Sequence, residues 1–293
     1  MSFKLTKFYY FPLLISFFVI SSSPAFSDDG VSSIKVTPDI RAYAISTVKP
    51  VLDSYAKKDK LSVLLKASKV LIDPEKGIHV NAIKPSNYII YDILDKIKFG
   101  FLITFKLSPE QKKNIKFWHS KYMQKNPADV FFAPSADDII KTRAAFGCSH
   151  YARSFMAVAK ALNLIDNPKD LRYVVSSKAD DYDRALEKND KEMTINGHQF
   201  VIAKIDSRWI AINTSKSEWT AMPKGFSPDA LNPPENVPIW FESYPEFIFL
   251  LRKIGKDYDD DCDDNSLNAL MNISRSGNAQ DSNFKWNKFA AMQ

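Results

Sequence analysis

The stretch GHQFVIAKIDSRWIAINTS, residues 197–215, carries the clearest fold signal in this chain. Two runs rich in apolar and β-branched residues flank the dipeptide DS at 206–207, which is typical of a β-hairpin with a two-residue turn. With that turn, Phe200 lies opposite Asn213, and His198 lies one diagonal step away on the same face of the sheet. The hairpin therefore predicts an imidazole beside an amide that can hold one of its ring nitrogens.

Upstream of the hairpin, the stretch AFGCSHYARS, residues 145–154, contains one of only two cysteines in the chain. Cys148 follows Gly147 and begins a helical pattern, because apolar residues recur at i+4, i+7, i+11 and i+14 from it. A thiol at a helix N-terminus lies beside backbone N–H groups and the positive end of the helix dipole, and both stabilise the thiolate. The same N–H groups can stabilise an oxyanion on a substrate carbonyl. This position predicts a reactive thiol.

A nucleophilic cysteine needs a base, and the chain has four histidines. His150 lies two residues from Cys148, so on a helix it points about 200° away from the thiol. His79 and His119 lie in the N-terminal half without a carboxylate or amide placed to orient them. His198, which the hairpin places beside an amide, is therefore the expected base.

The order cysteine, histidine and polar third residue, with the cysteine on a helix and the others on adjacent strands, resembles the transglutaminase-like superfamily of papain-like cysteine enzymes. The matching segments are GCSHYARSFMAVAKALNL (147–164) and the hairpin, and LRYVVSS (171–177) falls where the family has a strand between them. The resemblance covers about residues 138 to 215. It implies an α+β fold in which the cysteine-bearing helix packs on an antiparallel sheet, here with an N-terminal helical extension.

The resemblance also implies a chemistry and its residues. Cys148 would be the nucleophile, His198 the base and acid, and Asn213 the orienting group. Such enzymes form a thioester from an amide carbonyl and pass the acyl group to water or an amine. We expect hydrolysis of peptide or protein amides rather than crosslinking, because nothing in the sequence identifies an amine site. Bacterial members usually carry aspartate where this chain has Asn213. The alternative is therefore a weakly active or inactive member that serves as a binding module.

Other candidate sites are weaker. Trp209 and Trp219 either pack in the core or wall a substrate groove. A zinc site built from Cys148, His150 and His198 is a further alternative, although the chain has no Cys-x-x-Cys motif or closely spaced histidine pair to support it. We therefore expect no metal and no cofactor.

The acidic segment DYDDDCDD, residues 257–264, suggests calcium binding at first sight. An EF-hand loop that starts at Asp257 needs glycine at position six and glutamate at position twelve, where this chain has Cys262 and Asn268. A solvated acidic turn is the better interpretation. A disulfide between Cys148 and Cys262 is possible in an exported protein, and the sequence leaves it open.

The N-terminal residues are typical of a secretory signal peptide. Lys4 and Lys7 precede an apolar run at 8–20, and small residues follow at Ala25 and Ser27. The run is too short to span a bilayer, so we expect export to the periplasm or beyond, with no stable membrane anchor after the signal is removed.

The chain divides into four expected parts: a signal peptide (1–27), a helical N-terminal region (28–100), a transglutaminase-like domain (101–255), and an acidic segment with a loosely ordered tail (256–293). Within them, the pattern predicts helix over 37–73 with a break or kink at Pro50, and a polar connector at 179–197. The net charge of +6 is dispersed. It indicates solvated helix faces, and we expect a peptide or protein partner and no nucleic acid.

Overall fold

The protein is α+β in the computed structural model, which describes residues 34–56, 59–78, 109–123, 134–145, 147–188, 196–228 and 237–255. Its helical segments are α1 (Pro38–Tyr43), the π-helical η1 (Ala44–Val48), α2 (Lys49–Asp53), α3 (Lys60–Leu71), α5 (Pro109–Trp118), the π-helical η3 (His119–Met123), α7 (Ala136–Thr142), α8 (Cys148–Ala161), the 3-10 turn η4 (Pro168–Asp170) and α9 (Ala179–Glu187). The expectations for 1–27 and 256–293 lie outside the described residues.

The described strands form one antiparallel sheet of six strands in the order β4-β3-β2-β1-β6-β5. They are β1 (Leu171–Lys178), β2 (Gly197–Ile205), β3 (Arg208–Asn213), β4 (Glu218–Ala221), β5 (Pro238–Trp240) and β6 (Ile248–Gly255). The sheet is therefore built from three neighbouring strands β2, β3 and β4 on one side of β1 and the pair β5 and β6 on the other.

The hairpin of β2 and β3 has the expected two-residue turn. Asp206 and Ser207 have φ values of 46° and 67°, both in the left-handed region. This is the type I′ geometry, whose twist matches that of the flanking strands. The pairing runs as far as Val201 opposite Ile212, the register that such a turn requires. The predicted hairpin register is confirmed.

The expected N-terminal helical region is present over its described residues, with one difference in form. The Thr37 hydroxyl accepts a hydrogen bond from the N–H of Ile40 and so caps α1. Pro50 lies inside α2 and does not end the helix, which continues to Asp53. The irregularity expected there takes the form of the widened π-helical turn η1, directly before α2.

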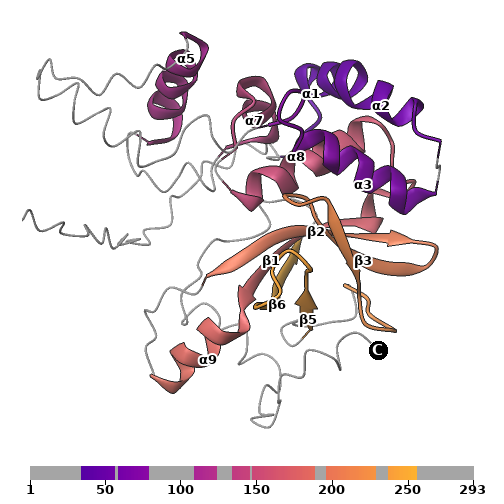
Figure 1. Ribbon diagram of the computed structural model, residues 1–293, viewed down its shortest axis with the longest axis vertical. Coiled ribbons are helices and arrows are strands. Elements are labelled where there is room, and N and C mark those ends of the chain that lie inside the picture. The colour runs from indigo at the N-terminus through magenta and orange to yellow at the C-terminus, as the bar shows by residue number, and fades with distance from the viewer. Residues whose placement is uncertain are drawn as a thin grey trace, which may run out of the picture.

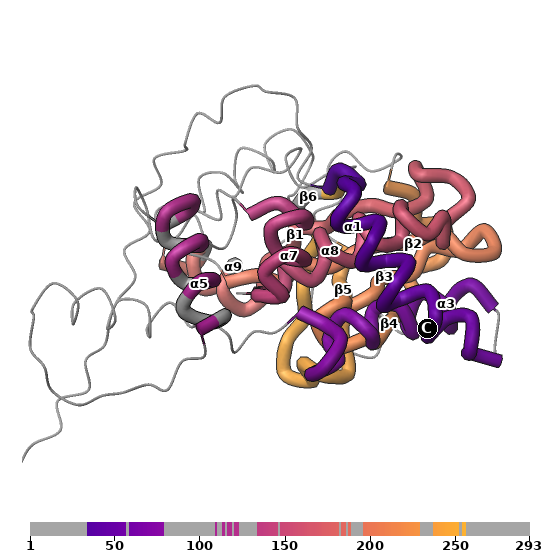
Figure 2. The backbone as a smooth tube through the Cα atoms, turned by 90° about the horizontal axis from the view of Figure 1, so that it is seen from above, coloured from indigo at the N-terminus to yellow at the C-terminus, as the bar shows by residue number. Residues whose placement is uncertain are grey.

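Helices α1, α3, α7 and α8 gather over one face of the sheet (Figures 1 and 2). The core between them contains the buried side chains of α8 and of alternate strand residues, such as Val201, Ala203 and Ile212. The N-terminal helices contribute to the same core through residues such as Ile40 and Leu64, which are fully buried. The helix that begins at Cys148 is thus held rigidly against β1 and β2.

The other face of the sheet is covered by aromatic residues from the chain around β5. Phe200 and Trp209 on this face pack with Phe241 and Phe249, and all four are buried. His198 belongs to the same alternation as Phe200, so its ring enters this aromatic cluster.

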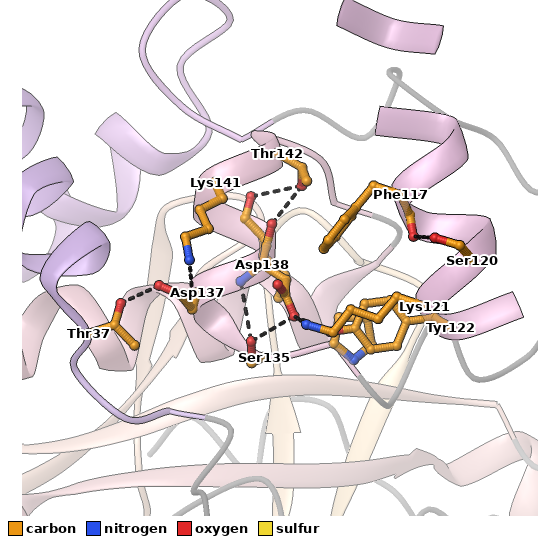
Figure 3. A network of polar contacts seen from close by, with 12 residues as sticks. Thr37, Phe117, Ser120, Lys121, Tyr122, Ser135, Asp137, Asp138, Lys141 and Thr142 are labelled. Atoms are coloured by element: carbon orange, nitrogen blue, oxygen red, sulfur yellow. Dashed lines mark hydrogen bonds and ion pairs between the residues drawn. The ribbon is translucent and has the colours of Figure 1, made fainter. Parts of the chain in front are cut away.

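Helix α5 and η3 pack beside α7 and α8 through a polar network around Asp138 (Figure 3). The carboxylate of Asp138 accepts hydrogen bonds from Lys121 (2.6 Å), Tyr122 and Ser135 (3.1 Å). Next to it, the buried ring of His150 stacks on Trp118 with their centroids 5.9 Å apart. His150 therefore has a packing role on the side of α8 that faces α5.

The prediction of a polar connector at 179–197 is wrong in its first half, which forms α9. Acidic residues in the first turn favour a helix start, and Ala179 and Ala185 bury one side of the helix. The Asp181 carboxylate accepts from the backbone N–H (3.1 Å) and the side-chain amide (2.7 Å) of Asn196, which ties the connector to the start of β2.

Candidate active site

Cys148 is the first residue of α8, and its sulfur lies against the start of β2. The backbone N–H of Gln199 donates to this sulfur at 3.3 Å. The pairing of β2 with β3 ends at Val201, two residues after Gln199. The Gln199 N–H therefore has no β3 partner in that pairing and donates to the thiol. Cys148 is a free, partly exposed thiol in the structure, and Cys262 lies outside the described residues.

Gly147, directly before the thiol, leaves space around it. Its backbone is extended, with φ −175° and ψ −173°, a conformation open to any residue. A Cβ built there meets no heavy atom within 4 Å. Outside the two adjacent residues, no described atom therefore crowds the Cβ position of Gly147, directly before the thiol.

His198 and Asn213 meet on the face of the hairpin away from the helices. The Nε2 atom of His198 lies 2.9 Å from Oδ1 of Asn213, and both side chains are buried, with 4% and 0% exposed. Since Nε2 is engaged by the amide, Nδ1 is the nitrogen left for Cys148, whose thiolate interacts electrostatically with the imidazole. Three side chains far apart in the sequence are thus joined in one chain of contacts.

Electrostatics favour an ion pair within this arrangement. Burial raises the pKa of the Cys148 thiol, but the His198 imidazole, the Gln199 N–H and the Ser149 N–H outweigh it, and the net pKa is lowered. Burial lowers the pKa of His198, while the thiolate, the Asn213 amide and the Glu218 carboxylate raise it, and the net pKa is raised. Both shifts favour thiolate and imidazolium over the neutral pair.

A close contact between β1 and β2 fixes the backbone under His198. A Cβ at Gly197 would lie 1.9 Å from the carbonyl oxygen of Ser176, so only glycine fits at this position. The Ser176 hydroxyl donates to the His198 carbonyl (2.6 Å) and accepts from its N–H (3.3 Å). The imidazole therefore projects from a backbone that β1 holds at both its N–H and its carbonyl.

Four aromatic rings surround the His198 imidazole: Tyr244 (centroids 5.2 Å apart), Phe249 (5.3 Å), Phe241 (5.9 Å) and Phe200 (6.0 Å). They exclude water from much of the ring and restrict its orientation. This low-dielectric surrounding strengthens the hydrogen bond to Asn213 and the attraction to the thiolate.

Behind Asn213 lies a carboxylate that the sequence analysis did not select. Asn213 Nδ2 donates to Glu218 Oε1 at 2.6 Å, and the two residues face each other across the β3–β4 pairing. Ser243 donates to Glu218 through its backbone N–H (2.9 Å) and its hydroxyl, and the Ser215 hydroxyl donates to Asn213 Oδ1 at 2.9 Å. A hairpin turn at 214–217 was the signal that would have placed Glu218 opposite Asn213.

The remaining predicted residues lie apart from the thiol network. Trp209 is buried and packs edge-on against Phe226, which favours the packing role considered for it. Trp219 is 46% exposed, on the β4 strand. His150, the third ligand of the zinc alternative, stacks on Trp118.

Among the described residues, no three histidine, cysteine or acidic side chains are placed to hold a metal ion together. In the same part of the chain, none of the helices combines the length and the apolar character that crossing a membrane requires.

The sequence matches no protein-family model, and neither a curated protein nor a solved structure shows significant similarity to the chain.

Proposed function

We propose that this protein is a cysteine-dependent acyl-transfer enzyme of the transglutaminase-like, papain-like type, which acts on amide bonds of peptides or proteins. The observation that carries the proposal is the continuous contact from the Cys148 sulfur through the His198 imidazole to the Asn213 amide. This is the arrangement in which a thiol is activated by a base that a third residue orients.

In the proposed reaction the Cys148 thiolate attacks the amide carbonyl carbon, and the N–H groups at the start of α8 stabilise the negative charge that develops on the oxygen. The His198 imidazolium gives its proton to the amine nitrogen as the C–N bond breaks, which leaves a thioester. Water then attacks the thioester and gives a proton to His198, and the thiolate leaves. The products are a carboxylic acid and an amine.

We favour water as the acyl acceptor, and a peptide or protein as the substrate. The space beside Gly147 lies next to the residue that bears the thiol, and the described contacts of the site identify no binding position for an amine. We also propose export of the chain, on the basis of the residues at 1–27. N-terminal sequencing of the protein recovered from the periplasm or the medium tests this, and an intact Met1 there would contradict cleavage.

Iodoacetamide labelling with mass mapping of the modified residue tests the proposed nucleophile. Because the pKa of Cys148 is lowered, its labelling rate should fall less steeply than that of an ordinary thiol as the pH falls from 8 to 6. An ordinary thiol such as the one expected at Cys262 should slow by about tenfold per pH unit below its pKa. Cys262→Ser isolates the Cys148 signal, and Cys148→Ser is the control that should abolish it.

Equal and slow labelling of both cysteines over this pH range would contradict the enzyme proposal and favour the non-catalytic binding module. Hydrolysis of a peptide library by the wild type, absent in Cys148→Ser, would extend the proposal from a reactive thiol to an amidase. Zinc bound in stoichiometric amount by elemental analysis, and lost in Cys148→Ser, would instead support the zinc alternative.

A further inference from the structure

We propose that Glu218 is a positioning residue of this site, whose carboxylate orients the Asn213 amide and so determines which nitrogen of His198 faces Cys148. The inference rests on the proposed function, and it adds a fourth residue to the three that the sequence predicts. It is carried by the contacts of Glu218 with Asn213 and Ser243.

The orientation of the amide follows from the chemistry of its two neighbours. A carboxylate only accepts hydrogen bonds, so the side of the Asn213 amide that faces Glu218 must be Nδ2. Oδ1 is then the atom that faces His198, and it also accepts from the Ser215 hydroxyl. An acceptor at this place requires the proton on Nε2, which directs Nδ1 to Cys148.

Glu218 itself is fixed by contacts from a different part of the chain. Ser243, in the segment between β5 and β6, donates to both carboxylate oxygens, and it lies next to Tyr244, whose ring packs on His198. The Asn213 amide also approaches the Ser243 hydroxyl at 3.3 Å. The β4 carboxylate and the segment that covers the imidazole are therefore one connected unit.

The charge of Glu218 has a second effect on the site. None of the lysine and arginine side chains that the structure describes pairs with this carboxylate. The titratable groups around the imidazole are the Cys148 thiol, the Glu218 carboxylate and the Tyr244 phenol. Of the two anions, Glu218 is the one that remains when the thiolate is consumed in the reaction. Through its contact with Asn213, Glu218 therefore supplies the negative charge that an asparagine lacks.

Glu218→Gln tests this with almost no change in shape. A glutamine cannot accept from Asn213 and both Ser243 donors at once, so the amide orientation is no longer determined and the charge is lost. Because the Glu218 carboxylate raises the pKa of His198, we expect the step of the Cys148 alkylation profile at which the imidazolium loses its proton to move to lower pH by about one unit. Glu242→Gln, an exposed carboxylate next to Ser243 that takes no part in these contacts, is the matched control and should leave the profile unchanged.

Adding Asn213→Asp to Glu218→Gln moves the carboxylate one residue closer to His198, and the glutamine amide can then donate to it. The double variant should return the step at which the imidazolium loses its proton to within about 0.3 pH unit of the wild type, because contacting residues couple non-additively. A Glu218→Gln profile identical to the wild type, or a double variant shifted at least as far as the single one, would overturn the proposal.

Nitrogen NMR of the His198 ring in the wild-type protein gives a test that needs no variant. We expect protonated Nε2 at every pH at which the imidazole is neutral, and Nε2 without a proton would overturn the inference. This result is independent of reactivity. An unreactive Cys148 with protonated Nε2 would reject the proposed enzyme but retain the role of Glu218, and a reactive Cys148 with an unprotonated Nε2 would do the reverse.

Discussion

Two carboxylates, Asp138 and Glu218, each organise a polar network in this protein, and their surroundings differ in one decisive respect. Asp138, at the start of α7, is buried and paired with Lys121, whose nitrogen lies 2.6 Å away (Figure 3). Glu218, at the start of β4, is held by an amide, a hydroxyl and a backbone N–H. Lys121 neutralises the charge of Asp138 within its own network. Glu218 instead acts on His198 through the Asn213 amide.

The comparison separates a structural carboxylate from one that acts on a reactive group. Tyr122, at the end of the Asp138 network, has its pKa raised by burial and by its hydrogen bond to Asp138, so it stays a neutral phenol. At the end of the Glu218 network, Cys148 has a lowered pKa and His198 a raised one. A carboxylate at the centre of a hydrogen-bond network thus stabilises packing around Asp138, and it stabilises the charges of Cys148 and His198 around Glu218.

Removing the imidazole should have the largest effect. In His198→Ala, Cys148 loses its main counter-charge and returns toward the pKa of an ordinary thiol. At pH 6 its alkylation should slow by about a hundredfold, because the smaller thiolate fraction is only partly offset by the higher nucleophilicity of a more basic thiolate. The rate of iodoacetamide labelling in the Cys262→Ser background measures this. A rate within twofold of that of the Cys262→Ser protein would contradict the role of His198 in lowering the pKa of Cys148.

Truncating the Asp138 side chain should lower the free energy of unfolding and leave the reactivity of Cys148 unchanged. Asp138→Ala removes the acceptor of Lys121, Tyr122 and Ser135, and we expect a loss of about 2 kcal/mol in the free energy of unfolding. Urea unfolding measures the loss, and labelling of Cys148 well below the transition should proceed at the wild-type rate. The matched control is Asp53→Ala, which removes an exposed carboxylate and its Lys49 contact and should cost less than about 0.5 kcal/mol.

Local sequence signals were sufficient for the elements that carry the site. The apolar period of α8 and the two-residue turn of the β2–β3 hairpin are both properties of contiguous residues, and the helix that starts at Cys148 and the hairpin register are confirmed. His198 and Asn213 share a sheet face because strand side chains alternate with a period of two. The meeting of Cys148 with this hairpin is tertiary, and the sequence suggested it only indirectly, through the elimination of the other histidines and through the family resemblance.

The parts that the sequence did not reveal depend on contacts between distant segments. Ser243 lies between β5 and β6, which stand at the opposite end of the strand order from β4, because β6 pairs with β1. It nevertheless contacts Glu218 at the start of β4. No local pattern specifies that crossover. Helix α9 was missed for a different reason, since its many charged residues resemble a connector, although its few apolar residues lie on one side of the helix.

The smallest change concerns the hydroxyl of Tyr122. In Tyr122→Phe, Asp138 keeps Lys121 and Ser135 as partners, so the loss should be about 1 kcal/mol in the free energy of unfolding near neutral pH, with no change in Cys148 labelling. Tyr55→Phe, in a residue outside both networks, is the control and should change stability by less than about 0.5 kcal/mol.

The pH dependence of that difference gives the sharper test. The folded-state pKa of Tyr122 lies above its ordinary value of 10.0, so its contribution to stability is complete below pH 10 and decreases as the pH rises toward the folded-state value. Phenylalanine does not titrate. The stability difference between wild type and Tyr122→Phe should therefore be constant up to about pH 9 and then narrow above pH 10. A stability difference that grows above pH 10 would mean that the Tyr122 phenol ionises more readily in the folded protein. Asp138 would then not keep its neighbour neutral, and the contrast with Glu218 would fail.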